Sequence, residues 1–165
     1  MTNTTQTKHT IAISVNDQPG VLQRVSGLFG RRGFNIESIT VGQSEEPGLS
    51  RMVIVSTGDD KTIEQIEKQL YKIIDVIKVV DLSANPMVGR ELALIKVKSE
   101  PGTRPEIMGL VETFRAAVVD IGTHSLMVQV VGDTEKIDAM IELLSPYGIR
   151  ELSRTGVTAM IRGNA

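Results

Sequence analysis

The chain has 165 residues, of which 41% are hydrophobic and 23% are charged, and its formal net charge at pH 7 is −2. These values are typical of a soluble globular protein, and the missing basic excess disfavours nucleic acid and anionic membranes as partners. The absence of cysteine excludes disulfides, thiolate nucleophiles and cysteine-ligated zinc.

Residues 1–8 are polar and rich in threonine, without the apolar core of a signal peptide. No uninterrupted apolar run approaches the length of a transmembrane helix. We therefore expect a cytoplasmic protein that does not enter the membrane and that begins with a disordered lead-in over residues 1–8.

The first half of the chain predicts six elements in the order βαββαβ. Apolar residues that recur along short segments indicate four strands, at residues 9–15, 34–42, 49–57 and 76–82. Apolar residues at helical spacing indicate one helix from Val21 to Phe29 and a second from Ile63 to Ile73. Asp59 or Asp60 is the expected N-cap of the second helix.

Residues 83–90 contain Asn85-Pro86 and Gly89 and are typical of a linker, after which a similar pattern begins again. The expected strands are at residues 92–98, 117–121 and 126–131, with a final strand or hairpin over 149–161. Two further helical stripes run from Ile107 to Phe114 and from Ile137 to Leu144.

Two pairs of turn residues repeat in the same order and indicate a structural duplication. A shift of 82 residues places Pro19-Gly20 on Pro101-Gly102, and a shift of 74 places Gly58-Asp59 on Gly132-Asp133. Right-handed crossovers place both helices of each copy on one side of its sheet. The sequence thus predicts an α+β protein with two ferredoxin-like βαββαβ domains, at residues 9–82 and 91–165, joined by a linker at 83–90.

Such a sheet leaves one face open, and apolar residues occur on the strands that form it. An exposed apolar patch on a sheet favours association with a partner. We therefore expect at least a homodimer, on the evidence of Ile39, Val41, Val53 and Val55.

No catalytic or metal-binding signature is present in the sequence. The two histidines, His9 and His124, are not at metal-ligand spacing, and neither a nucleophile elbow nor a phosphate-binding loop occurs. The acidic pairs Glu45-Glu46 and Asp59-Asp60 fit a solvated turn and a helix start rather than an acid–base pair. We expect no catalytic residue and no metal ligand.

Residues 16–22 combine a strand end, a turn and a helix start. Free N–H groups at a helix start attract a carboxylate, and Gly20 allows a close approach to the backbone. Asp17 could accept a hydrogen bond from an ammonium group, and the side chains of Val21 and Leu22 could hold an aliphatic tail. The same residues fit an ordinary turn without a ligand, so the loop alone leaves both readings open.

The sequence NDQPGVLQRVSGLFGRRGFNIESITVG at residues 16–42 resembles the ACT domain that opens the small subunit of acetolactate synthase (acetohydroxyacid synthase). The resemblance continues through LSRMVIV at 49–55 and EQIEKQLYKIIDVIKV at 64–79, and so covers nearly all of the first half. The second half resembles the same family more loosely, through RELALIKV at 90–97 and Arg154-Thr155-Gly156.

The resemblance implies a non-catalytic subunit that takes part in the biosynthesis of branched-chain amino acids. Such a subunit binds the large catalytic subunit, raises its activity and confers feedback inhibition by valine or another branched-chain amino acid. The large subunit carries thiamine diphosphate, magnesium and FAD, and no cofactor is expected in this chain.

The resemblance also implies a homodimer of ACT domains with the effector between two chains. The ligand would lie at Asp17, Gly20, Val21 and Leu22 of one chain and would face Asn35, Ile36, Val41 and Gly42 of the other. The family usually has asparagine in place of Asp17. A carboxylate at this position can hold the ammonium group or repel the ligand carboxylate, so the identity of the effector stays open.

Three alternatives can be compared with this reading. A stand-alone ACT-type module could act on another enzyme. An enzyme in its own right would need a thiamine diphosphate site, for which no motif is present. An RNA-recognition module stacks bases on strand aromatics, but residues 49–57 contain none.

Overall fold

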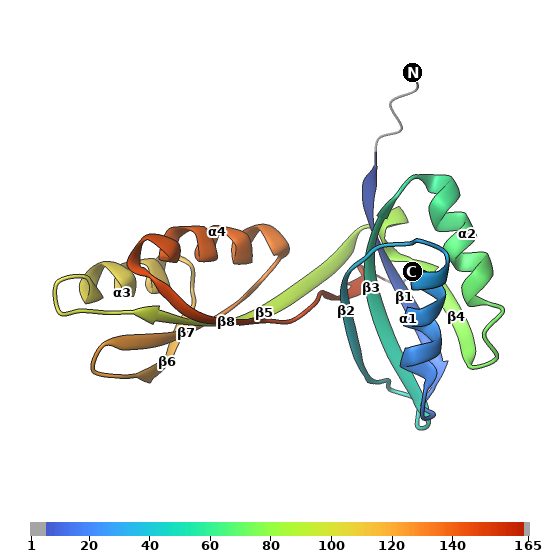
Figure 1. Ribbon diagram of the computed structural model, residues 1–165, viewed down its shortest axis with the longest axis horizontal. Helices are drawn as coiled ribbons and strands as arrows, with labels where there is room; N and C mark the ends of the chain where they lie inside the picture. The colour runs from blue at the N-terminus through green and yellow to red at the C-terminus, as the bar shows by residue number, and fades with distance from the viewer. Residues whose placement is uncertain (1–5, 164–165) are drawn as a thin grey trace, which may run out of the picture. The chain divides into compact units, whose positions relative to one another are not determined.

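The computed structural model describes residues 6–163, which form two compact units (Figure 1). The first unit contains the chain up to Val88 together with the residues from Val157 onward, and the second unit runs from Gly89 to Gly156. Of the predicted lead-in, residues 1–5 lie outside the described residues. Thr7 and Lys8 belong to the first strand, where they pair with Gly58 and Thr57. The predicted disorder is therefore wrong for these two residues.

The first unit is an antiparallel sheet with two helices on one face (Figure 1). The sheet order is β2-β3-β1-β4, which confirms the ferredoxin-like arrangement predicted for this half. The elements are β1 (Thr7–Asn16), α1 (Val21–Arg31), β2 (Ile36–Gln43), β3 (Leu49–Gly58), α2 (Asp60–Leu70) and β4 (Val76–Asp81).

Strand alternation and helical spacing direct the apolar side chains of these elements into one core. Its buried members include Ile11, Ile13, Met52 and Ile54 from the strands and Val25, Phe29, Ile63 and Ile66 from the helices. Helix α2 begins where Asp59 accepts the backbone N–H of Thr62 at 2.8 Å, as expected of an N-cap.

The four apolar residues expected on the open face lie on two different faces. Ile39 pairs with Ile54 and Val41 with Met52, so both point to the helix side of the sheet. Val53 and Val55 do lie on the opposite face, but both are buried. The expected exposed patch is therefore absent from the described part of this face, because another strand covers it.

That strand is β9 (Thr158–Ile161), the last element of the chain. Ala159 packs in a small cluster with Ala12, Val53 and Leu82, on the sheet face that the helices leave open. Leu82 lies in the short 3₁₀ helix η1 (Leu82–Ala84).

The second unit repeats the same architecture (Figure 1). Its sheet order is β6-β7-β5-β8, and its core contains Ile95, Val97, Val128, Ile107, Val111, Ile137 and Met140. The elements are β5 (Met87–Lys98), α3 (Arg104–Thr113), β6 (Ala117–Ile121), β7 (Ser125–Gly132), α4 (Thr134–Leu144), η2 (Ser145–Tyr147) and β8 (Ile149–Arg154).

The predicted domain boundaries need two corrections. The expected linker at 83–90 contains η1 and the start of β5, a strand that begins in the first unit and continues into the second. The expected second domain at 91–165 ends at Gly156. Residues from Val157 onward belong to the first unit because β9 pairs with β5 and buries Ala159.

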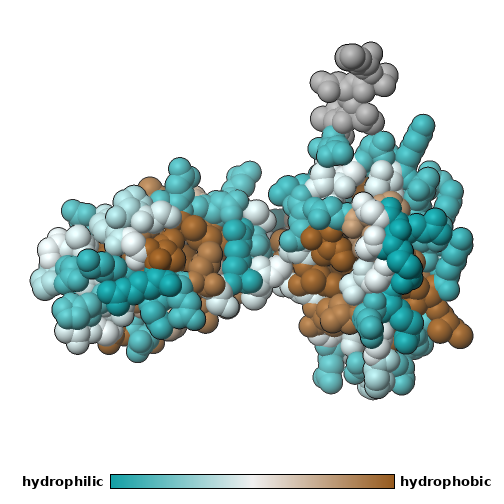
Figure 2. All heavy atoms as spheres, in the orientation of Figure 1, coloured by the Kyte–Doolittle hydropathy of each residue, from teal (hydrophilic) through white to brown (hydrophobic). Residues whose placement is uncertain are grey.

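The surface of each unit carries both hydrophilic areas and apolar patches (Figure 2). None of the helices among the described residues has the length and apolar character needed to cross a membrane.

Candidate functional site

The loop that follows β1 is held in place from two sides. The backbone N–H of Asn16 donates to the carbonyl of Asp75, and that of Asp17 donates to the carbonyl of Gly48, both at 2.9 Å. Asp75 precedes β4, and Gly48 lies in the hairpin between β2 and β3. The loop is therefore fixed by the same sheet that carries the other candidate residues.

Gly20 gives this loop its sharp entry into α1. Its φ of 85° lies in the left-handed region, which residues with a Cβ atom rarely adopt. A Cβ atom added at this position would lie 3.2 Å from Nη1 of Arg24. The backbone conformation of the turn therefore favours glycine, whereas the Arg24 side chain would need to move by only a few tenths of an ångström to accommodate a Cβ atom.

Arg24 and Asp75 form an ion pair beside this turn, which the sequence did not predict. Asp75 is buried, whereas Arg24 is half-exposed. The guanidinium thus neutralises the buried Asp75 carboxylate beside the loop.

The first turn of α1 is open. Among the described residues no side chain caps this turn, and it carries no acidic residue. By contrast, Asp59 caps α2 and Asp133 caps α4. The N–H of Val21 donates to the carbonyl of Gln18 at 3.4 Å, so the helix dipole and the other N–H groups of this first turn are available to an anion.

The structure assigns different positions to the predicted residues of the loop. Asp17 and Gly20 are exposed. Val21 is only 3% exposed and belongs to the core, so its side chain cannot hold a ligand tail and only its backbone can contribute. The side chain of Leu22 is 46% exposed and available at the surface.

The predicted residues on β2 lie at two ends of the strand. Ile36 pairs with Ser56 and Gly42 pairs with Arg51, so the two ends are roughly 20 Å apart at about 3.3 Å per residue. Within one chain, the loop after β1 lies near the Gly42 end, because Asp17 bonds to the hairpin that follows β2. The structure does not bring the loop to Asn35 and Ile36 of the same chain.

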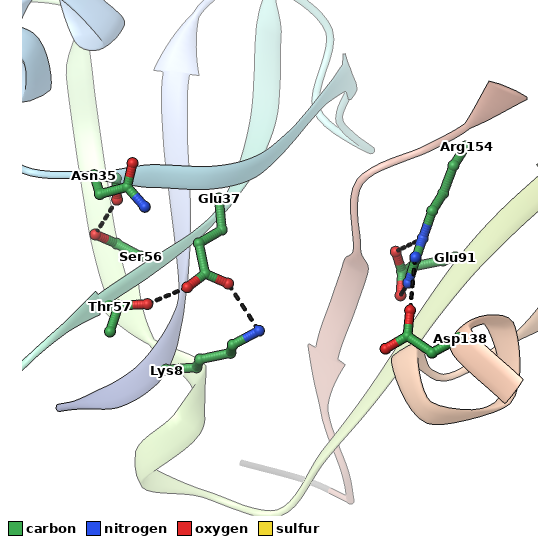
Figure 3. Close-up of polar contacts among 8 residues, drawn as sticks. All are labelled: Lys8, Asn35, Glu37, Ser56, Thr57, Glu91, Asp138 and Arg154. Carbon is green, nitrogen blue, oxygen red and sulfur yellow. Dashed lines mark hydrogen bonds and ion pairs between the residues drawn. The ribbon is translucent and has the colours of Figure 1, made fainter. Parts of the chain in front are cut away.

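Asn35 and Ile36 are fixed mainly through their backbone. The carbonyl of Asn35 accepts the hydroxyl of Ser56 at 2.6 Å, which leaves the exposed Asn35 side chain pointing away from this bond (Figure 3). Ile36 is half-buried against the core, whereas Val41 is 47% exposed. Val41 and the exposed Gly42 are thus the accessible residues of the strand near the loop.

A polar hollow of about 740 Å³ lies beside Asn35, where α1 ends and α2 begins. Glu37 projects into a network with Thr57 and Lys8, whose Nζ lies 2.9 Å from the Glu37 carboxylate (Figure 3). The hydrogen bond from Thr57, followed by that from Lys8, lowers the pKa of Glu37 below its ordinary value. The hollow thus contains a fixed negative charge, and no sequence motif indicated it.

The second unit carries a charged cluster at the end of β8. Arg154 donates to Glu91 at 3.0 Å and to Asp138 at 2.7 Å (Figure 3). The hydrogen bond to the buried Glu91 is the largest cause that raises the pKa of Arg154. Next to it, the backbone N–H of Thr155 donates to the carbonyl of Leu92 at 2.9 Å. The Arg154-Thr155-Gly156 motif thus fixes the chain where it leaves the second unit.

The start of α3, the corresponding turn of the second unit, also has no side-chain cap, but it carries the acidic Glu106 in its first turn. The guanidinium of Arg104 donates to Ser99 at 2.9 Å and to the carbonyl of Gly122 at 3.1 Å. Pro105 in the first turn of α3 also lacks an N–H group. The structural duplication therefore does not duplicate the open helix start.

Comparison with known families identifies both halves of the chain. Residues 11–78 match the family model described as an acetohydroxyacid synthase (AHAS) small subunit-like ACT domain. Residues 90–163 match the model described as the small subunit of acetolactate synthase. The chain belongs to the acetolactate synthase small-subunit family. This confirms the resemblance drawn from residues 16–42.

Individual small subunits are similar over nearly their whole length. The acetolactate synthase small subunit of Bacillus subtilis is 53% identical over 157 residues, which cover 94% of this chain and 91% of that protein. The probable small subunit of Methanothermobacter thermautotrophicus is 55% identical, with 94% of each chain covered. The crystal structure of the Thermotoga maritima small subunit is 48% identical and superposes with a TM-score of 0.90, covering 96% of this chain and 99% of that one.

Proposed function

We propose that this small subunit is the non-catalytic regulatory subunit of an acetolactate synthase in branched-chain amino-acid biosynthesis. It binds the large catalytic subunit, raises its activity and confers feedback inhibition by valine. The names of the relatives, which are small subunits of this enzyme, support the assignment of the partner. Thiamine diphosphate, magnesium and FAD belong to the large subunit in this proposal, and the complex acts in the cytoplasm.

The open first turn of α1 is the observation that supports effector binding most directly. The backbone of Gly20 to Leu22 binds the carboxylate of the amino acid, and the N–H of Val21 exchanges its long hydrogen bond to the Gln18 carbonyl for one to the ligand. The helix dipole adds a favourable interaction. Asp17 accepts a hydrogen bond from the ammonium group. The exposed side chains of Leu22 and Val41 contact the isopropyl group, a suitable match for a small branched aliphatic tail.

A second copy completes the site in this proposal. β2 and β4 are the edges of the described sheet, and the Tyr71 hydroxyl occupies the β4 edge, where it accepts the N–H of Val79 at 3.0 Å. β2 is therefore the better edge for pairing with another chain. In an antiparallel pair of β2 strands, the start of one strand lies beside the end of the other. This pairing brings Asn35 and Ile36 of the second copy toward Gly42 and the loop of the first.

Calorimetry with the purified chain and valine, leucine or isoleucine tests effector binding, and sedimentation tests the dimer. The matching large subunit is assayed for acetolactate formation with and without this chain. We expect activation by the chain, inhibition by valine and heat of valine binding. The absence of both heat and inhibition with all three amino acids would contradict the sensing role. Binding without any effect on the large subunit would indicate that another enzyme is the target.

A further inference from the structure

Strand β9 is attached to the sheet face behind the candidate effector site. The hydroxyl of Thr40 donates to the carbonyl of Val157 at 3.1 Å, and Nη2 of Arg51 donates to the carbonyl of Ala159 at 2.9 Å. Thr40 precedes Val41 on β2, and Arg51 pairs directly with Gly42 across β2 and β3. The two side chains that hold β9 are therefore neighbours of two candidate effector residues.

Apolar packing contributes to this attachment through the buried Ala159 and through the partly buried Val157 and Ile161. Of the four residues of β9, Ala159 is buried, with 2% of its surface exposed, whereas Met160 is 66% exposed. Pairing with β5 also holds the strand. The side-chain hydrogen bonds from Thr40 and from the charged Arg51 add to this pairing and packing, and they are the contacts that join the β9 segment to β2 and β3.

The segment that precedes β9 is anchored in the second unit by hydrogen bonds. Thr155 bonds to Leu92 through its backbone N–H and its hydroxyl, both at 2.9 Å, and Arg154 bonds to Glu91. Gly156 is the single residue between Thr155, which is fixed in the second unit, and Val157, which is fixed in the first. The anchored Thr155 and the attached segment of β9 are therefore consecutive along the backbone except for Gly156.

We propose that β9 is the element through which effector binding at β2 is communicated to the second unit, with Arg51 and Thr40 as the positioning residues. The proposal rests on the function proposed above. An effector that orders β2 near Val41 and Gly42 also orders Thr40 and Arg51, and so strengthens the attachment of β9. Because coupling between two binding events is reciprocal, an attached β9 strengthens effector binding by the same factor.

A chemical probe of β9 is possible because the chain contains no cysteine. Ala159→Cys places one thiol at the buried position, and Met160→Cys places one at the exposed neighbour as a control. Alkylation of each full-length variant is followed with and without valine. We expect the thiol at 159 to react slowly and valine to slow it at least threefold further, while the thiol at 160 reacts rapidly in both conditions.

Arg51→Met removes the charged hydrogen bond but keeps a long side chain, and Thr40→Val removes the other bond at nearly constant volume. Arg150→Met, at an exposed arginine on β8, is the matched control. We expect either test variant to speed alkylation at position 159 and to raise the valine concentration for half-inhibition of the complete enzyme at least fivefold, as for a typical coupling between sites. Arg150→Met behaves like the parent chain, and circular dichroism confirms that each variant is folded.

The outcomes separate the two proposals. If calorimetry detects valine binding but valine leaves alkylation at 159 unchanged, β9 is a static cover and the coupling proposal is overturned. Unchanged valine inhibition in both folded test variants overturns it as well. If the parent chain neither binds valine nor confers inhibition, the proposed function fails first, and the coupling proposal fails with it.

Discussion

Arg24 reaches from the first helix to the carboxylate of Asp75, 51 residues away in the sequence, and lies above the glycine turn that begins the helix. This contact ties together the helix start, the segment before β4 and, through the Asp75 carbonyl, the end of β1. The candidate effector loop thus depends on a charge that belongs to the fold rather than to the ligand.

Arg24→Met should lower the free energy of unfolding by about 1–2 kcal/mol, because it leaves the buried Asp75 carboxylate without its partner. Urea unfolding measures this loss. Asp75→Asn serves as the second arm of a double-mutant cycle, and the double variant should recover part of the stability. Strictly additive losses would show that the two side chains do not stabilise each other.

Gly20→Asp should abolish valine inhibition while leaving activation of the large subunit largely intact, because it places a negative charge where the proposed site holds the ligand carboxylate. Gly20→Asn is the matched control, since asparagine has nearly the same size and tolerates the left-handed conformation similarly. We expect the control to retain most of the inhibition. Equal loss in the two variants would mean that shape at this turn, rather than charge, governs binding.

Tyr71→Phe should expose the edge of β4, because the hydroxyl accepts the N–H of Val79 and donates to its carbonyl. Amide hydrogen exchange at Val79 should accelerate at least tenfold, while the core amides of β1 remain protected. Tyr147→Phe is the control, since that hydroxyl bonds to Glu106 in the second unit. Unchanged exchange at Val79 would show that the hydroxyl does not close this edge.

Glu37 and Glu67 should give pH dependences of opposite sign. The pKa of Glu37 is lowered in the folded state, mainly by the hydrogen bond from Thr57, so its contribution to stability is present above pH 4.5 and is lost as the pH falls through the folded pKa. The pKa of Glu67 is raised, mainly by burial and then by Asp81, so this carboxyl destabilises the fold as the pH rises above 4.5.

Compared with the parent chain, Glu67→Gln should therefore raise the free energy of unfolding at pH 7 more than at pH 4. Glu37→Gln should lower the free energy of unfolding at pH 7 more than at pH 4. Urea unfolding of both variants and the parent chain between pH 4 and pH 7 measures the two slopes. The same sign of change for both variants would contradict the assignment of the two environments.

Local patterns were sufficient to predict the repeated βαββαβ order, because the apolar spacing in helices such as α1 and α2 is a property of neighbouring residues. An N-cap at Asp59 or Asp60 was predicted for the same reason, and the structure assigns it to Asp59. The family was recognised from the first unit, where residues 16–42 carry the longest continuous motif.

Features that depend on distant pairing were not predicted. The register that turns Ile39 and Val41 to the helix side is set by β3, and the Arg24–Asp75 pair joins residues far apart in the sequence. A break at Gly156 was predicted from the sequence, but the return of β9 to the first unit was not, because it depends on pairing with a distant strand. The partner-dependent half of the effector site stays a prediction, because a single chain places Asn35 at the far end of β2.

The return of β9 to the first unit means that this unit is encoded by two separated stretches of the gene. A stop codon shortly after the codon for Gly156 would leave the whole second unit intact and would remove part of the first. It would uncover Ala12 and Val53 on the sheet, and a truncated product of this kind should aggregate rather than lose a dispensable tail. A fragment that ends at residue 88 has the same defect, so a faithful isolated sensor needs residues 157–163 joined back to it through a short artificial loop.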